Sequence, residues 1–84
     1  MKFKYIFGEN KSTGNNAVVI FDIIQTHKDV AQQMTNIIPQ SAGFLTFKES
    51  NEGITVTCWG ESISLKLSTD IYDAHRIKSL MELH

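Results

Sequence analysis

Carboxylate, imidazole and guanidinium groups that could perform acid–base chemistry lie close together near the carboxyl end of the chain, at Asp70, Asp73, His75 and Arg76. A general acid and a general base must reach the same substrate. On a helix, residues two positions apart, such as Asp73 and His75, point to different sides. The spacing of Asp73 and Arg76 is instead typical of an exposed pair on a helix surface. The sequence therefore predicts no catalytic residue in this segment.

Metal and thiol chemistry also find no support. His27, His75 and His84 have no second ligand at the spacing that a zinc site uses, so we expect no metal and no cofactor. Cys58 continues the alternation of the apolar residues before it, which places the thiol on the inward side of a strand. A thiol buried among apolar groups is inert. We interpret Cys58 as a core residue.

Residues 8–14, with the sequence GENKSTG, contain the lysine and hydroxyl residues of a phosphate-binding loop. That loop needs a glycine directly before the lysine and a helix after the hydroxyl residue. Here Asn10 precedes Lys11, and a run of β-branched residues follows the loop. The segment therefore predicts a polar hairpin loop.

Two further residues each allow two interpretations. Asp22 is the single charge in an apolar run; it is either buried with a partner, which would mark a site, or exposed near the end of a strand, which is the commoner arrangement. Trp59 follows the outward-facing positions of its strand. It is either a stacking or anchoring residue or a cover over the turn at Gly60.

Composition narrows the class of protein. The 84 residues include eight basic and nine acidic side chains, a formal net charge of −1, and one cysteine. A dedicated nucleic-acid binder carries an excess of positive charge, so we expect nucleic acid not to be the main partner. The longest apolar run is too short to span a bilayer, and a single cysteine suits a reducing compartment. We expect a single cytoplasmic domain that does not bind membranes.

Alternating apolar and polar residues predict five strands. Residues 2–7 and 17–24 form the first two, and the second is apolar on both faces, as in a central strand. Residues 44–67 then predict a three-stranded meander with turns at residues 51–53 and 60–62. In this meander we expect Leu45, Val56 and Cys58 to point inward, together with Ile63, Leu65 and Leu67 in the third strand.

Two helices complete the fold. Thr26 is a plausible N-cap for a helix that ends before Pro39, with a stripe that begins at Val30 and Met34. The second predicted helix covers residues 68–84, where Lys78 and Glu82 form a surface pair. The order β-β-α-β-β-β-α predicts an α+β, two-layer sandwich, with a mostly antiparallel sheet of about five strands and both helices on one face.

Two helices can cover only one face of such a sheet. An apolar row on the other face is a candidate interface, which we assign to Val18, Ile20, Asp22 and Trp59. We therefore predict a homo-oligomer, a twofold dimer formed through the open sheet face or an edge. The alternative is that residues 8–16 and Trp59 itself cover these side chains.

The leading functional hypothesis is a small non-enzymatic interaction protein that self-associates and binds a protein partner through the open face. A second hypothesis is a binder of single-stranded nucleic acid that uses Lys48, Trp59 and Lys66 as charges and stacking platform. A third is an enzyme or small-ligand binder with a pocket between sheet and helices, shared between subunits. The sequence shows no signature of a particular partner or ligand.

Overall fold

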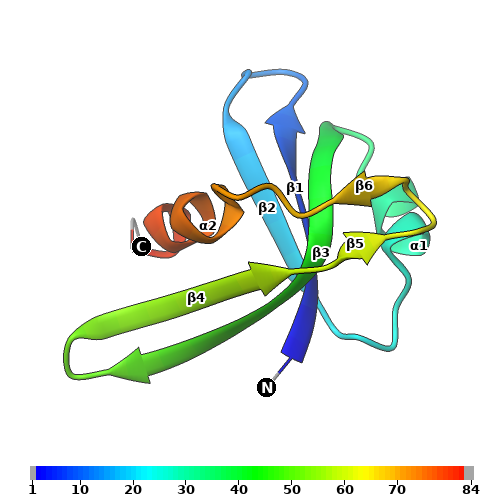
Figure 1. The fold of residues 1–84 in the computed structure, drawn as a ribbon. Helices are drawn as coiled ribbons and strands as arrows, with labels where there is room; N and C mark the ends of the chain where they lie inside the picture. Colours follow the sequence, from blue (N-terminus) through cyan, green and yellow to red (C-terminus); the bar gives the residue numbers. More distant parts are fainter. Residues whose placement is uncertain (1, 83–84) are drawn as a thin grey trace.

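In the computed structural model, which describes residues 2–82, a four-stranded antiparallel sheet has the strand order β2-β1-β3-β4 (Figure 1). Two short strands, β5 and β6, form a separate hairpin. The elements in chain order are β1 (Lys2–Asn10), β2 (Asn16–Phe21), α1 (His27–Gln33), β3 (Ile37–Ser50), β4 (Gly53–Trp59), β5 (Glu61–Ser62), β6 (Leu67–Ser68) and α2 (Asp73–Glu82). The α+β class is confirmed, but the sheet, its layers and its strand order differ from the prediction.

The first two strands form an antiparallel hairpin, as the alternation predicted. The loop between them is a polar turn in which the Asn10 side-chain oxygen accepts the backbone N–H groups of Ser12 and Thr13. Because a second strand follows the loop, the hairpin interpretation is confirmed. However, β2 lies at the edge of the sheet and not at its centre, and it ends at Phe21. The prediction extended the strand to residue 24, but Ile24 lies in a turn and is 85% exposed.

Helix α1 begins as predicted and ends early. The Thr26 hydroxyl accepts the backbone N–H of Asp29 at 3.1 Å, so the N-cap is confirmed. The predicted end at Pro39 is wrong, because the helix ends at Gln33 and the chain is already extended from residue 37. Pro39 lies within β3 where the pairing with β1 shifts register, between Phe7 and Gly8. A bulge of this kind tolerates a residue that cannot donate a backbone hydrogen bond.

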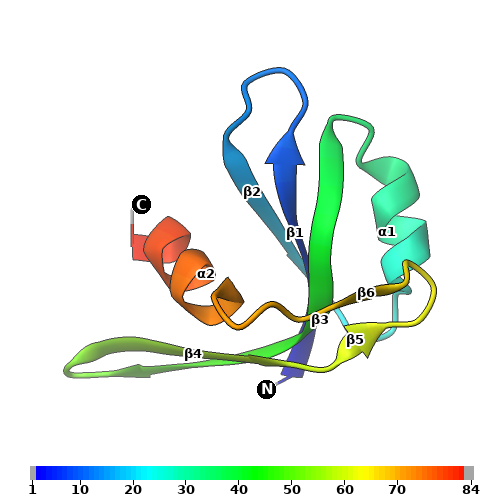
Figure 2. The same ribbon diagram turned by 45° about the horizontal axis from the view of Figure 1, so that its top comes forward.

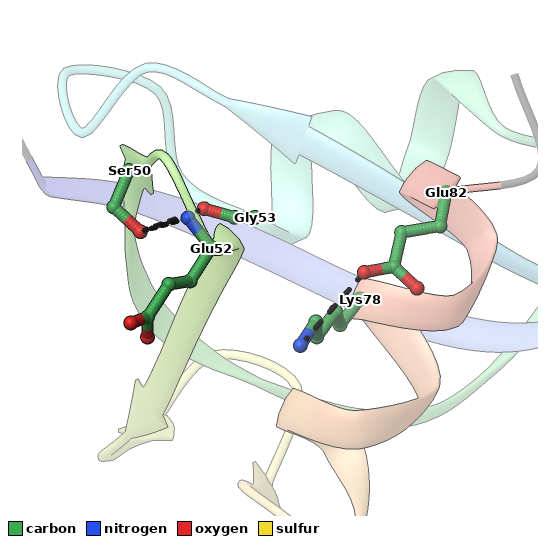
Figure 3. A network of polar contacts seen from close by, with 5 residues as sticks. All are labelled: Ser50, Glu52, Gly53, Lys78 and Glu82. Carbon is green, nitrogen blue, oxygen red and sulfur yellow. Dashed lines mark hydrogen bonds and ion pairs between the residues drawn. The ribbon is translucent and has the colours of Figure 1, made fainter.

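Strands β3 and β4 form the hairpin predicted for the start of the meander, with Leu45 opposite Cys58 and Phe47 opposite Val56. A turn closes it in which the Ser50 hydroxyl contacts the carbonyl of Gly53 and the N–H of Glu52 (Figure 3). Burial alternates along β4 as the sequence predicted.

The third strand of the meander does not exist, and this part of the prediction is wrong. Residues 63–66 form a turn, and Lys66 has a positive φ of 56° that a strand cannot accommodate. The two ends of the segment instead pair with each other as β5 and β6, with Ser62 opposite Leu67. Ile63, predicted to point inward, is 84% exposed. Leu65 and Leu67 are half-buried, as part of a small cover on the sheet.

The two helices lie on opposite faces of the sheet, so the two-layer arrangement is wrong (Figure 2). Helix α2 packs through Ile77 on the face that carries Tyr5, Phe7 and Leu45. Helix α1 packs through Val30 on the other face. The second cluster also contains Ile6, Phe21 and Ala42, with Leu65 and Leu67 of the β5–β6 segment against it. The core is therefore divided into two clusters, one on each face.

The chain must cross from one face to the other between β6 and α2, and it does so beside Gly43. A Cβ atom at Gly43 would lie 2.3 Å from the Thr69 hydroxyl oxygen and 2.6 Å from the Trp59 carbonyl oxygen. Any larger residue would therefore collide with the crossing segment. Glycine at this position lets the backbone after β6 pass close to β3 and reach the far face.

A buried hydrogen bond holds the start of α2 on the sheet. The Tyr5 hydroxyl donates to the Asp73 carboxylate at 2.5 Å and lies 3.1 Å from the Thr69 hydroxyl. The same carboxylate oxygen accepts the backbone N–H of Asp70, in the manner of a capping box. Asp73 is fully buried, and its other oxygen has no hydrogen-bond partner within residues 2–82.

The predicted surface pair of Asp73 with Arg76 is therefore wrong, because Asp73 faces the sheet. Arg76 instead lies over the rings of Phe7 and Tyr72, 5.6 and 5.7 Å from their centroids. The other predicted pair, Lys78 with Glu82, is confirmed at 3.8 Å on the exposed side of α2 (Figure 3). No helix within residues 2–82 is long and apolar enough to cross a membrane.

We predict that Tyr5→Phe lowers the free energy of unfolding by about 1–3 kcal/mol, because the buried Asp73 carboxylate would lose a donor. Urea unfolding followed by circular dichroism measures this change. Tyr72→Phe is the matched control; its side chain is 58% exposed, so we expect a change within about 0.5 kcal/mol. Equal effects of the two substitutions would contradict the role given to the Tyr5 hydroxyl.

Candidate functional site

The four residues predicted as one interface lie in three different places. Val18 and Ile20 pack against the cluster under α2. Trp59 lies opposite Phe44 on the face that carries α1. Asp22 follows the end of β2 and is exposed, and its side chain accepts the backbone N–H of Ile24 at 3.2 Å. No single open face therefore carries all four.

With no single open face, the free edge of the sheet at β2 is the next candidate for an interface. In the described part of the chain, β2 pairs with no strand other than β1, and from Ala17 to Phe21 it contains no charged residue and no proline. The side chains of residues 17–20 are half-buried, on alternating faces of the sheet, and Phe21 is buried. An exposed edge strand normally carries charges, proline or a bulge that prevents pairing with another strand. None of these devices occurs between Ala17 and Phe21.

A cavity of about 510 Å³ lies between the sheet and the first turn of α1, beside the turn that joins β5 to β6. Figure 2 shows this hairpin next to α1. The side chains that line the cavity come from β1, β3, α1 and the β5–β6 segment, which are far apart in the sequence. They include Lys4, His27, Phe44, Glu61, Ser62 and Ile63.

Phe44 is one of the residues that line this cavity, and three other side chains contact its ring. Trp59 stacks on it with ring centroids 6.2 Å apart and an interplanar angle of 26°. The His27 ring meets it edge-on at 6.1 Å, and the Lys2 ammonium lies 5.1 Å from its centroid. Gly60, with a positive φ of 83°, lies so close that a Cβ there would be 2.9 Å from the ring.

The polar groups around the cavity are also held in place. The Lys4 ammonium donates to the backbone carbonyl of Gln25 at 2.7 Å. His27 is buried, and its Nε2 lies 2.9 Å from the carbonyl oxygen of Gly43, so this nitrogen carries the proton. Burial lowers the pKa of His27, with a smaller contribution from Lys4, and outweighs the opposing effect of the Gly43 bond. His27 is therefore a neutral donor in the wall of the cavity.

Of the three residues in the nucleic-acid hypothesis, Lys48 and Trp59 share one face of the sheet, whereas Lys66 does not lie on it. Lys48 lies on the same face of the β3–β4 hairpin as Trp59, since it pairs with Thr55. Lys66 belongs to the turn between β5 and β6 and not to this hairpin. The structure adds Lys2 and Lys4, which the register places on the same face as Phe44.

Sequence reasoning missed Lys2, Lys4, Phe44 and His27 as possible site residues. The alternation of residues 2–7 did show that the two lysines face away from Phe3 and Tyr5. It did not show that β3 would be the neighbouring strand. The sequence could not show that His27 is a buried donor, because its partner is the backbone carbonyl of Gly43, 16 residues away.

The other candidate chemistry is not assembled. Asp73 is buried and His75 is exposed, so these two residues do not share a site. Burial, with a contribution from the nearby Asp73 charge, raises the pKa of Cys58 to about 11, which keeps the thiol protonated at neutral pH. Within residues 2–82, no group of three or more His, Cys, Asp or Glu side chains has a geometry that could hold a metal ion.

Comparisons of the chain with protein-family models, with curated proteins and with solved structures gave no match.

We predict that the protein loses stability as the pH falls from about 7 to about 5, and that His27 causes part of the loss. Because burial lowers the pKa of His27 below its ordinary value of 6.5, the unfolded chain binds the proton first and is favoured in acid. Urea unfolding at a series of pH values measures the slope. His27→Gln keeps a donor for Gly43 and should flatten the slope.

The matched control is His75→Gln, which changes an exposed histidine on α2. This variant should retain the slope of the wild type. The interpretation of His27 as a buried neutral donor is wrong if His27→Gln shows the same pH dependence as the wild type.

Proposed function

We propose that the protein is a small non-enzymatic interaction protein that self-associates through the edge strand β2. In this proposal two copies pair their β2 strands about a twofold axis, and the two sheets become one continuous sheet. A protein partner with an extended segment would bind at the same edge. We also propose a reducing, cytoplasmic location, because Cys58 is the single cysteine.

The observation that carries the proposal is the unprotected edge. A strand at the edge of a sheet presents unpaired N–H and C=O groups, and these form hydrogen bonds readily with another strand. The residues of β2 from Ala17 to Phe21 are all apolar and uncharged, so no charge on this strand opposes the approach of a second one. Hydrogen bonds from a second β2 would pair these groups.

Packing supports the same edge. Val18 and Ile20 contact the cluster under α2, whereas Val19 contacts the cluster under α1. A second β2 strand would therefore extend both apolar clusters at once. The opposite edge offers less, because the side chains of Thr55 and Thr57 on β4 are polar and exposed. A domain of this size has a small core, so burial of additional apolar area stabilises it.

We predict that the wild type sediments as a dimer, with twice the chain mass of 9.5 kDa, in analytical ultracentrifugation. Ala17→Lys introduces a charge at the β2 edge and should shift the mass to that of the monomer. Thr57→Lys places the same charge on the opposite edge and should leave the dimer intact. A thermal melt of each variant checks that the fold is retained.

Hydrogen exchange distinguishes the edge from other dimer surfaces. The amides of residues 17–21 that point away from β1 should become more protected as the protein concentration rises, and the amides of β4 should not. A wild type that stays monomeric up to its solubility limit contradicts the proposal. A dimer whose β2 amides do not change would contradict the choice of edge.

Binding of single-stranded nucleic acid is a second candidate, favoured by one observation. Phe44 and Trp59 stack on a face of the sheet that also carries Lys2, Lys4 and Lys48. Bases stack on aromatic rings, and lysines near them neutralise phosphates. The net charge of −1 weighs against this candidate.

Trp59 is the single tryptophan, so its fluorescence reports on this surface. If nucleic acid binds there, an oligothymidylate should quench the emission at low salt, and added salt should reverse the effect. Lys48→Gln should weaken this binding, whereas Lys78→Gln on α2 should not. Absence of quenching at low salt would eliminate the candidate.

A further inference from the structure

We propose that Arg76 of one copy forms an ion pair with Asp22 of the other across the paired β2 strands, and that two such pairs fix the register of the dimer. The inference rests on the proposed self-association and names the side chains that select one alignment of the two strands. It can fail while the self-association stands, because a dimer in another register would still use the same edge.

The backbone of β2 alternates between groups that face β1 and groups that face the free edge. The Asn10 N–H donates to the Asn15 carbonyl at 2.8 Å at the closed end of the hairpin, so these two residues form a hydrogen-bonded pair. In an antiparallel ladder such pairs recur at every second position. The odd-numbered residues of β2 therefore bond to β1, and the free edge presents the N–H and C=O groups of Asn16, Val18 and Ile20.

This alternation restricts the register of two β2 strands. Antiparallel strands bond only where residues that face the shared edge lie opposite each other, so even-numbered residues must meet even-numbered residues. A register centred on Val19 places Val18 of one copy opposite Ile20 of the other, and Ala17 opposite Phe21. Every residue from Ala17 to Phe21 then lies opposite an apolar residue.

The same register determines where the charge that follows β2 lies. Asp22 comes directly after the strand, and with Val19 at the centre it lies at the level of Asn16 of the other copy. A shift by two residues would place either Asn16 opposite Ile20 or Asp22 opposite Val18, so that a polar side chain meets an apolar one. The register centred on Val19 avoids both pairings and leaves the carboxylate at the end of the junction.

The two charges are available for such a contact. Asp22 and Arg76 are both exposed. Within residues 2–82 the structure contains one ion pair, Lys78 with Glu82, so neither Asp22 nor Arg76 has an opposite charge beside it. One oxygen of Asp22 accepts the backbone N–H of Ile24, and a carboxylate has capacity for further donors.

Arg76 lies on the side of α2 that faces the β1–β2 hairpin. Its guanidinium carbon is 5.6 Å from the centroid of the Phe7 ring, and Phe7 pairs with Val18 of β2. Lys78 lies on the side of the helix toward the β3–β4 turn (Figure 3), and residues two positions apart on a helix point to different sides. Figures 1 and 2 show α2 between β2 and β4. The guanidinium is therefore on the same face as Val18, one strand away from the free edge.

The dimensions of a sheet bring the second copy near this guanidinium. Neighbouring strands are about 4.8 Å apart, so β2 of the other copy would lie about 10 Å from β1. Asp22 of that copy would lie about 7 Å further along, two residues beyond the position opposite Val18. A long arginine side chain keeps its aliphatic stem on an apolar surface while its charged head turns outward. Arg76 can therefore continue to cover Phe7 and still reach toward the carboxylate.

Native mass spectrometry of mixed variants tests the inference, because it separates homodimers from heterodimers by mass. Asp22→Arg alone places like charges at both ends of the junction, and so does Arg76→Asp alone. Each variant should therefore dimerise about tenfold more weakly than the wild type. In a mixture of the two variants, both ends of the heterodimer again join opposite charges. The heterodimer should exceed its statistical share and should dissociate at the same concentration as the wild-type dimer.

Charge reversals away from the junction are the matched controls. Lys66→Asp changes the turn between β5 and β6, and Glu49→Arg changes β3; neither position is on a strand that pairs with β2. A mixture of these two variants should form homodimers and heterodimers in the statistical proportion. Added salt should weaken the wild-type dimer more than that of Arg76→Gln, which lacks the ion pair. Thermal melts show whether each variant is folded.

The outcomes distinguish the ion pair from the self-association itself. Enrichment of the heterodimer supports the inference. A wild-type dimer without this enrichment overturns the ion pair and leaves the β2 edge as the interface. Single variants that dimerise as tightly as the wild type would overturn it too, because the two charges would then lie far apart. A wild type that stays monomeric removes the inference together with the proposed self-association.

Discussion

Burial of three consecutive residues in β1 is the constraint on which this fold depends. Tyr5, Ile6 and Phe7 are each at most 1% exposed. Because neighbouring side chains in a strand point to opposite faces, both faces of the sheet must be covered at this strand. Helix α2 covers Tyr5 and Phe7, and α1 with the β5–β6 segment covers Ile6. An 84-residue chain can provide only a thin cover on each face.

The thin cover explains where the polar interactions are needed. The chain crosses from one face to the other between β6 and α2, and the crossing passes close to Gly43. After the crossing, the chain forms α2, which is short and amphipathic. The hydrogen bond from Tyr5 to Asp73 fixes the start of this helix on the sheet. The same bond satisfies a hydroxyl group and one oxygen of a carboxylate in an apolar cluster, where unpaired groups are costly.

The thin cover also determines which surfaces remain available. Within residues 2–82, β2 pairs with β1 on one side and with no strand on the other. On the other side of β1, α1 has only seven residues and does not fill the space between the sheet and the β5–β6 turn. The cavity over Phe44 lies in that space. The unpaired edge of β2 and the cavity therefore have one origin, which is a sheet that the two short helices cover only in part.

The sequence by itself determined the local structure. The alternation of apolar residues identified the β1–β2 hairpin, the hairpin of β3 with β4 and the inward position of Cys58. Cap chemistry identified the start of α1 at Thr26. These features depend on interactions between residues that are close in the chain, so the residue types and their spacing are sufficient to predict them.

The tertiary structure decided the rest. The pairing of β1 with β3 extends the strand through Pro39, where the residue type alone indicated the end of a helix. The turn at Lys66 and the pairing of β5 with β6 replaced a strand whose alternation looked complete. Asp73 is buried because Tyr5 lies opposite it, 68 residues away, and Lys4 reaches Phe44 only through the strand order. Contacts between distant segments fix such features, and residue spacing contains no information about which segments will meet.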